Sequence, residues 1–308
     1  MLISFVIPSH DEEPSLRKLT DQIIAHTEPT GHDFEIIFID DGSTDNSLAV
    51  LRELHQEDPR IRVIQFRRNF GKAAALMAGF AQAKGEIIFT MDADLQDDPV
   101  EIPRFLEKLE EGYDLVSGWK YPRLDPITKT APSKLANFSI RLGSGMKLHD
   151  FNCGYKAMRA EVANEIKLYG DLHRYVPVLA NWRGFNVTEI KVRHHPRQFG
   201  RSKYGISRLS RGLFDFITVI FLIRFTRRPL HFFGWLGLIS LGLGFLADGY
   251  LTVLWLMGET IGHRPLLTLG TLLIIIGAQF ISLGLLAELL SYSIISREEE
   301  YTIREILD

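Results

Sequence analysis

The chain is 308 residues long, enough for one or two domains, and its net charge of -3 lacks the basic excess of nucleic-acid-binding proteins. We therefore expect no nucleic-acid partner. Its single cysteine, Cys153, excludes an intrachain disulfide and fits a reducing compartment. Residues 1–8 lack the basic start of a signal peptide and are interpreted as the first strand.

From residue 1 to about residue 196, short apolar runs alternate with helical patterns. The predicted strands are Ser4–Ile7, Phe34–Ile39, Arg62–Phe66, Glu86–Met91, Asp114–Ser117 and Val187–Val192. Between them, Asp45–Glu57 and the alanine-rich Gly71–Ala83 have helical patterns. This β-α-β-α order predicts an α/β fold in which helices cover both faces of a mostly parallel sheet.

The last third of the chain has a different character. Pro229–Met257 and Pro265–Ser293 are mostly apolar, and each exceeds the roughly 20 residues that a membrane-spanning helix needs. The short connection Gly258–Arg264 predicts an antiparallel hairpin. Two long buried helices of a soluble domain are the alternative. Asp248 and Glu288, inside the spans, are expected to face the neighbouring helix, another subunit or the membrane interface.

Basic residues gather on the two flanks of this predicted hairpin. They are Arg208, Arg211, Arg224, Arg227, Arg228, Arg297 and Arg304, against Arg264 and His263 in the loop. The positive-inside rule then places both flanks, and with them the large domain, on the cytoplasmic side of the inner (plasma) membrane. The stretch Ile206–Phe225 mixes apolar and charged residues and predicts helices lying in the membrane interface, with an ordinary packed linker as the alternative.

These patterns predict a domain organisation. We expect the α/β domain at 1–205, interfacial helices at 206–228, a transmembrane hairpin at 229–293 and a cytoplasmic tail at 294–308. Small residues in the first span would allow close helix contacts and lead us to expect a homo-oligomer. These residues are Gly234, Gly237, Gly242 and Gly244.

An acidic segment follows the fourth predicted strand. Asp92 and Asp94 stand two residues apart where that strand ends, and the amide of Gln96 follows. In an open α/β sheet this edge is where ligands bind. Hard oxygen ligands suit Mg²⁺ or Mn²⁺, which would hold a diphosphate. An acidic turn that caps a helix beginning at Pro99 is the alternative.

Other polar clusters should meet the acidic segment at the same edge. Asp40 and Asp41 end the second predicted strand, and an acidic cluster with Glu12 ends the first. Converging carboxylates are unfavourable without a cation or hydrogen-bonding sugar and base groups. The segment Arg67–Lys72 supplies basic and amide groups, although Asn69 alternatively only caps the next helix. Helix capping is likewise the alternative for Ser43, Thr44 and Asp45.

Six ordered segments carry a resemblance to a known family. They are the opening strand with Pro8 and Glu12, Asp40–Ser43, Asn69–Lys72, Asp92–Pro99, Asp150–Lys156 and Arg197–Tyr204. Together they resemble the family 2 inverting glycosyltransferases with the GT-A fold. More narrowly, the chain is similar to the polyprenyl-phosphate sugar transferases, such as dolichol-phosphate mannose synthases and the bacterial GtrB-type undecaprenyl-phosphate glucosyltransferases. The resemblance covers nearly the whole chain, including both predicted spans.

The resemblance implies a metal-dependent, inverting sugar transfer to a polyprenyl phosphate. UDP-glucose is the first expectation for the donor, with GDP-mannose, a UDP-N-acetylhexosamine or a UDP-aminoarabinose derivative as alternatives. A processive polysaccharide synthase would carry a Gln-x-x-Arg-Trp motif, and a nucleotide-sugar pyrophosphorylase would carry a glycine-rich N-terminal loop; the sequence has neither. A non-catalytic membrane scaffold or flippase component is the alternative from another class.

The resemblance also implies residue roles. Donor-binding residues would be Pro8, Glu12, Asp40, Asp41, Asn69, Lys72 and Asp92. The metal would be held by Asp94 and Gln96, with Asp92 close by. Asp150 would lie beside the anomeric carbon and the acceptor. Phosphate groups would be bound by Lys120, Arg201 and Lys203, with Lys129, Ser133 and Lys134 as weaker candidates.

Two positions depart from the family pattern. Asp11 stands where the family usually has Asn, and Lys120 stands where the dolichol enzymes carry Arg, so a point charge replaces a planar fork. Two alternatives also remain for the implied site residues. Asp150 would merely start a strand, and Arg197–Lys203 would be a solvated basic loop. Cys153 is expected to be a packed small residue.

Overall fold

A computed structural model describes residues 1–121, 140–141, 145–196, 229–261 and 264–295. The chain divides into two compact units, Met1–Val219 and Ile220–Asp308. The boundary between them falls outside the described residues, as do the predicted interfacial helices at 206–228 and residues 296–308 of the predicted tail.

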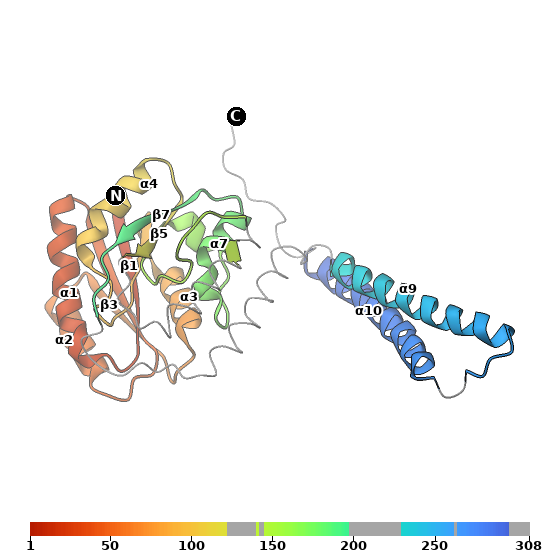
Figure 1. The fold of residues 1–308 in the computed structure, drawn as a ribbon. Coiled ribbons are helices and arrows are strands. Elements are labelled where there is room, and N and C mark those ends of the chain that lie inside the picture. The colour runs from red at the N-terminus through yellow and green to blue at the C-terminus, as the bar shows by residue number, and fades with distance from the viewer. Residues whose placement is uncertain (122–139, 142–144, 197–228, 262–263, 296–308) are drawn as a thin grey trace. The chain divides into compact units, whose positions relative to one another are not determined.

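The first unit is one mixed sheet with helices on both of its faces (Figure 1). Its strands lie in the order β3-β2-β1-β4-β6-β5-β7. In chain order the elements are β1 (Leu2–Ser9), α1 (Glu13–Thr27), η1 (Glu28–Thr30), β2 (Asp33–Asp40), α2 (Ser47–Glu57), β3 (Ile61–Gln65), α3 (Lys72–Gln82), β4 (Ile87–Thr90), η2 (Pro99–Glu101), α4 (Ile102–Glu110), β5 (Leu115–Lys120), β6 (Lys156–Arg159), α6 (Ala160–Glu165), η3 (Leu172–Tyr175), α7 (Val176–Trp182) and β7 (Val187–Val192).

Side chains that alternate along the central strands build a core on each face of the sheet. Phe5 of β1 stacks on Phe89 of β4 with ring centroids 5.1 Å apart, and Phe89 meets Phe105 of α4 edge to face. Val6, the next residue of β1, points to the other face. There Gly79 of α3 lies so close that a Cβ would come within 2.3 Å of the Val6 Cγ1. Because these neighbours contact different helices, both faces of the strand are buried.

The predicted parallel sheet is confirmed, with one strand that the sequence patterns missed. All six predicted strands are present, their ends shifted by up to three residues. β6 lies between β4 and β5 and runs antiparallel to both. Its four residues are Lys-Ala-Met-Arg, a run too short for an alternating pattern and charged at both ends. Pairing with two neighbours far away in sequence therefore decides its conformation.

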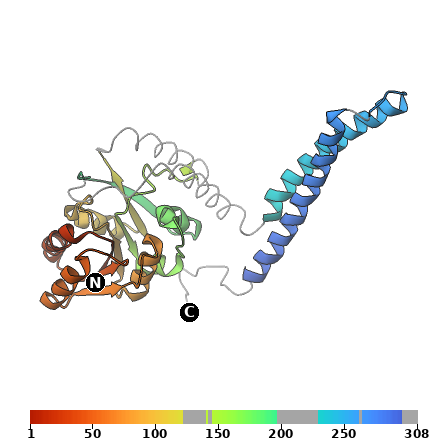
Figure 2. The same cartoon turned by 90° about the horizontal axis from the view of Figure 1, so that it is seen from below.

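The second unit is a pair of long apolar helices, α9 (Pro229–Leu256) and α10 (Pro265–Ile295), which lie side by side (Figures 1 and 2). Both are long and apolar enough to cross a membrane. Large apolar side chains are exposed along them, among them Leu246, Leu256 and Met257. Such surfaces suit a hydrocarbon solvent far better than water. The helices predicted from hydropathy are confirmed, with ends shifted by one and two residues.

Glycines make the close approach of α9 and α10 possible. A Cβ on Gly237 or Gly244 would lie 2.8 Å from the carbonyl oxygen of Gly277 or Gly270, respectively. These two glycines are therefore used within one chain, so they give no support to the predicted homo-oligomer. Gly242 has open space around its Cβ position, and the oligomeric state stays a prediction.

The two acidic residues of the spans both face the neighbouring helix, as expected. The Thr271 hydroxyl of α10 donates to the Asp248 carboxylate, with 3.4 Å between the oxygens. The Leu230 amide at the start of α9 donates to Glu288 at 3.1 Å. Each carboxylate thus has a partner inside the pair of helices, which lowers the cost of placing it in an apolar environment.

Candidate active site

The candidate residues lie together at one edge of the sheet, where the parallel strands end. β1, β2, β4 and β5 run parallel, so their carboxyl ends meet at this edge. The antiparallel strand β6 begins at the same edge, which brings the preceding segment, with Asp150, to it as well. Segments spread over more than 100 residues of sequence therefore converge where an open α/β sheet binds its ligands.

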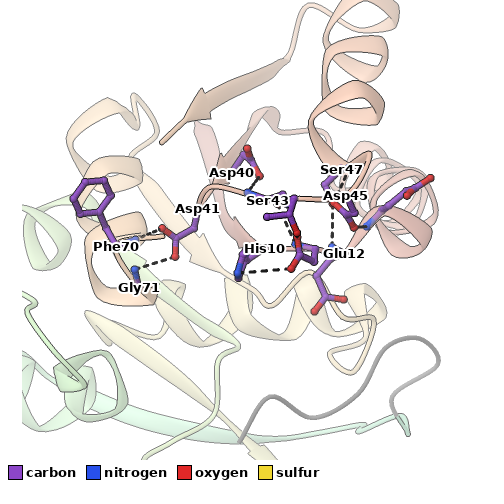
Figure 3. A network of polar contacts seen from close by, with 12 residues as sticks. His10, Glu12, Asp40, Asp41, Ser43, Asp45, Ser47, Phe70 and Gly71 are labelled. Carbon is purple, nitrogen blue, oxygen red and sulfur yellow. Dashed lines mark hydrogen bonds and ion pairs between the residues drawn. The ribbon is translucent and has the colours of Figure 1, made fainter. Parts of the chain in front are cut away.

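Asp41 anchors the loop that precedes α3. Its carboxylate accepts hydrogen bonds from the backbone amides of Phe70, at 2.7 Å, and Gly71, at 2.9 Å (Figure 3). The residue is only 5% exposed. Charge-assisted bonds of this kind are among the stronger hydrogen bonds in proteins. Asp41 therefore holds the segment that carries Asn69 and Lys72, a role that the sequence patterns did not predict.

The turn after β2 fits tightly between two other segments. Gly42 has a φ of +69°, and a Cβ there would come within 2.5 Å of the Arg68 backbone, so only glycine fits. Asp40 is buried and accepts from the Ser43 amide at 3.2 Å. The Asp11 carboxylate accepts from the Thr44 amide at 2.7 Å, which ties the β1 and β2 turns together. Asp11 thus has a structural role at a position where the family usually has Asn.

Lys72 and Asp92 form an ion pair at the centre of the edge. Burial opposes ionisation of Asp92, but the ammonium groups of Lys72 and Lys120 outweigh it and lower the pKa of Asp92 to about 2. Gly154 makes room for this carboxylate, because a Cβ at that position would lie 2.7 Å from Asp92 Oδ2. Asp92 is therefore a carboxylate at neutral pH.

The acidic segment after β4 alternates between buried and accessible residues. Met91, Ala93 and Leu95 are buried, whereas Asp92, Asp94 and Gln96 are partly exposed. Leu95 takes a left-handed backbone with φ of 59°, and Asp94 Oδ1 accepts from the Gln96 amide at 3.2 Å. This tight turn keeps the oxygen-bearing side chains on the accessible side, the arrangement that a cation site needs.

Helix capping accounts for part of the acidic segment but not for Asn69. Asp98 caps η2 by accepting from the Val100 amide at 3.1 Å, while Asp92 and Asp94 take no part in it. α3 begins after Gly71, which has no side chain to make a cap. The capping alternatives are therefore wrong for Asp92, Asp94 and Asn69. The N-cap position of α2 is Asn46, but Asp45 just before it accepts from the amide of Ser47, the first residue of the helix, at 2.9 Å.

Lys120, the last residue of β5, lies in a largely buried acidic environment. Its side chain is 14% exposed, and its ammonium is 3.6 Å from Asp97, whose side chain is 1% exposed. Burial disfavours the charged amine, but the carboxylates of Asp97, Asp92 and Asp150 raise the pKa of Lys120 above its usual range. Lys120 is thus a permanent cation facing the centre of the site.

Asp150 is 4% exposed and lies in no strand or helix of the described residues. Its Oδ1 accepts from the Asn152 amide at 3.1 Å, an Asx turn that fixes the side chain. β6 begins only at Lys156, so the alternative that Asp150 starts a strand is wrong. Cys153 is buried, as expected, and burial together with Asp97 raises the pKa of its thiol to about 12, which leaves it inert.

Comparisons with known proteins agree with this geometry. The family model described as Glycosyl transferase family 2 matches residues 4–167. The chain belongs to this family. It is 39% identical to the dodecaprenyl-phosphate galacturonate synthase of Rhizobium johnstonii, over 99% of this chain and 93% of that protein. It is 36% identical to the undecaprenyl-phosphate 4-deoxy-4-formamido-L-arabinose transferase of Pseudomonas fluorescens, over 99% and 90% of the two chains. Both likenesses include α9 and α10.

A solved structure shares the fold of this family 2 glycosyltransferase. Glucosyl-3-phosphoglycerate synthase of Mycobacterium tuberculosis, in complex with Mn²⁺, UDP and phosphoglyceric acid, superposes with a TM-score of 0.57 and 19% identity. The match covers 72% of this chain and 78% of that one. The GT-A fold predicted from the sequence motifs is therefore confirmed.

The predicted site residues of the glycosyltransferase come together in part. Asp40, Asp41, Lys72, Asp92, Asp94, Gln96, Lys120 and Asp150 all lie at the carboxyl edge of the sheet, beside Pro8, Glu12 and Asn69. Arg201 and Lys203 lie outside the described residues, as do Lys129, Ser133 and Lys134. The individual ligand contacts of all these residues stay predictions.

Three residues at this edge had no predicted role. Asp97 is the buried partner of Lys120, and Glu189 of β7 binds the backbone around Asp150. His173 of η3 packs near α3; burial, reinforced by the charge of Lys72, lowers its pKa to about 3, so it is a neutral imidazole. Glu189 could have been suspected, because it places a carboxylate within the predicted strand Val187–Val192, and Asp97 because it belongs to the acidic segment.

Removing the Asp41 carboxylate should release the loop before α3. We expect Asp41→Ala to lower thermal stability and UDP affinity together, since the two lost bonds to a charged group are worth about 1.5–3 kcal/mol each. Calorimetry and thermal unfolding measure both. Asp58→Ala is the control, because Asp58 pairs with Arg60 at the opposite edge of the sheet and should affect stability alone. Unchanged UDP affinity in Asp41→Ala would contradict the anchoring role.

Proposed function

We propose that the chain transfers a sugar from a nucleotide-diphosphate sugar to a polyprenyl phosphate, with inversion at the anomeric carbon. One observation carries the proposal: two polyprenyl-phosphate sugar enzymes match 99% of the chain, including the two apolar helices as well as the catalytic edge. A polyprenyl phosphate has an apolar chain, which lies in a membrane, and a polar phosphate. The apolar helices of the second unit suit a membrane, and the polar edge of the first unit suits the phosphate.

The donor sugar is proposed from the same relatives. Their names specify galacturonate and 4-deoxy-4-formamido-L-arabinose, so they give no support to the glucose expected from the sequence. We place UDP-galacturonate first, on the higher identity, with the formamido-arabinose and glucose donors next. The uridine nucleotide is our expectation from the bacterial resemblance.

A divalent cation fits the residues present. Asp92, Asp94 and Gln96 offer two carboxylates and an amide oxygen on the accessible side of one turn. Among the described residues, no three His, Cys, Asp or Glu side chains gather into a metal site. Such a complete protein cluster is not required, because Mg²⁺ is typically held by one or two carboxylates while substrate phosphates supply further ligands. Mn²⁺ prefers the same oxygen ligands. When bound, the cation would offset the charge that develops on the leaving diphosphate.

The residues of the chain then have distinct tasks in the displacement. A phosphate oxygen of the acceptor attacks the anomeric carbon, the glycosidic bond to the nucleotide diphosphate breaks, and its electron pair leaves with the diphosphate. A phosphate monoester is mostly ionised at neutral pH, because its second pKa is about 6. Asp150 therefore orients the acceptor and takes any remaining proton. Lys72 and Lys120 counter the repulsion between the anionic acceptor and donor.

The catalytic unit is proposed to face the cytoplasm, on the basic flanks of the hairpin. Cys153 is buried, so a cysteine introduced for Gly258 in the loop between α9 and α10 would be the accessible thiol of the described residues. We expect an impermeant maleimide to label Gly258→Cys in intact spheroplasts. A cysteine at exposed Glu53 in α2 is the control and should react only after lysis. The reverse pattern would overturn the orientation.

The deciding experiment is transfer of labelled sugar to undecaprenyl phosphate, with Mg²⁺ or Mn²⁺ and an EDTA control. We expect label in the lipid phase with UDP-galacturonate, and none with EDTA. Transfer from UDP-glucose or the formamido-arabinose donor alone would keep the reaction class and change the sugar. If neither transfer nor nucleotide binding occurs, the chain is a non-catalytic membrane scaffold.

A further inference from the structure

Glu189 binds the backbone on which Asp150 is carried. It lies in β7, where its side chain is 12% exposed. Its Oε2 accepts from the His149 amide at 2.7 Å and from the Asp150 amide at 3.4 Å, and its Oε1 pairs with the His149 ring. One carboxylate thus satisfies three donors of a segment that belongs to no strand or helix. Asp150 is buried, so its backbone amide would be costly without such a partner.

Trp119 holds the same segment from the neighbouring strand. Its indole stacks on the His149 imidazole, with ring centroids 4.0 Å apart and planes within 9°. Trp119 of β5 pairs in register with Lys191 of β7, two residues beyond Glu189. Because side chains alternate along a strand, Trp119 and Glu189 share one face of the sheet. Trp119, His149 and Glu189 form a clamp.

Two residues of the clamp directly precede the proposed reacting groups in the chain. Lys120 follows Trp119 in β5 and points to the opposite face, toward Asp97. Asp150 directly follows His149, whose ring stacks on Trp119. The clamp therefore sets where two catalytic candidates, 30 residues apart in sequence, stand relative to each other. The Asp150 carboxylate also contributes to the raised pKa of Lys120.

We propose that Glu189 and Trp119 are positioning residues, which hold Asp150 at the acceptor phosphate through the His149–Asp150 backbone. This inference rests on the proposed function. In this proposal, neither residue contacts the substrate. Their effect arises because a displacement of about 1 Å at a reacting group costs on the order of 10²-fold in rate. A catalytic group on an irregular loop depends on neighbours that lock it in place.

The test compares four variants with the wild-type chain. We expect Glu189→Ala and Trp119→Ala to lower kcat by about 10–100-fold, as expected for misplacement, with UDP affinity unchanged. Trp119→Phe keeps a stacking ring and should recover most of the rate. Glu107→Gln is the control, because Glu107 is exposed on α4 and takes no part in the clamp. It should behave as wild type.

The Asp150→Asn background distinguishes positioning from general stability. If the clamp acts through Asp150, Glu189→Ala should add little to the loss that Asp150→Asn already causes. An equal loss in both backgrounds, or a parallel fall in UDP affinity, would overturn the inference.

If the wild-type chain transfers no sugar, the proposed function fails. Hydrogen exchange at the His149 and Asp150 amides then tests the clamp: faster exchange in Glu189→Ala supports it, and unchanged exchange overturns it.

Discussion

Asp150→Asn should nearly abolish turnover while leaving donor binding intact. Asparagine has the same shape and keeps an oxygen that accepts from the Asn152 amide, so the turn around residue 150 persists. What is lost is the negative charge that we propose to lie beside the anomeric carbon. Proton transfer by a positioned side chain contributes roughly 10²–10⁴-fold to rate, and we expect a fall in kcat within that range.

The measurement is kcat for lipid-linked product, alongside UDP affinity by calorimetry and the melting temperature. The last two should match the wild type, because the substitution removes no hydrogen bond described for the Asp150 side chain. Near-normal turnover in Asp150→Asn would remove the carboxylate from the mechanism. Since the acceptor phosphate is largely ionised, a residual rate that rises with pH would show that Asp150 takes the remaining proton.

Asp94→Ala should remove the metal-dependent part of nucleotide binding. The carboxylate lies on the accessible side of a strained turn, next to Asp92 and Gln96. A cation that offsets charge on the leaving group supplies several kcal/mol, so we expect transfer to fall by about 10³-fold. UDP titrated with and without Mn²⁺ should then give the same, weak affinity.

Asp98→Asn is the matched control for this experiment. Asp98 lies four residues further along the same acidic segment, but it caps η2 and pairs with His195 at 2.9 Å. Asparagine can keep the cap, so both UDP affinity and its Mn²⁺ dependence should persist. An Asp94→Ala chain that still bound UDP more tightly with Mn²⁺ would sink the metal assignment and shift attention to Asp92.

Much of the fold followed from local sequence patterns. The apolar runs of β1, β2 and β4 and the long apolar segments of α9 and α10 are continuous features, so hydropathy alone predicts them. β6 escaped prediction because four residues with charged ends carry no periodic signal. It forms because β4 and β5 offer hydrogen-bonding edges on both sides.

The candidate site divides in a similar way. The acidic turn with Asp92 and Asp94 was predicted, since strand ends and oxygen ligands can both be recognised locally. The ion pair of Lys72 with Asp92 and the anchoring of Phe70 and Gly71 by Asp41 join groups 20 to 30 residues apart. No spacing rule predicts such contacts, because they depend on how the strands are ordered in the sheet.

The sequence by itself determined the class of this protein: a parallel α/β unit with acidic strand ends, followed by two apolar helices. These properties reside in short windows, where side-chain alternation, turn residues and hydropathy act locally. Only the tertiary structure decided which residues support others. Glu189 holds the backbone of Asp150, and Gly237 meets α10 instead of a second chain. Such roles arise from contacts across folded elements, whose distances no local pattern contains.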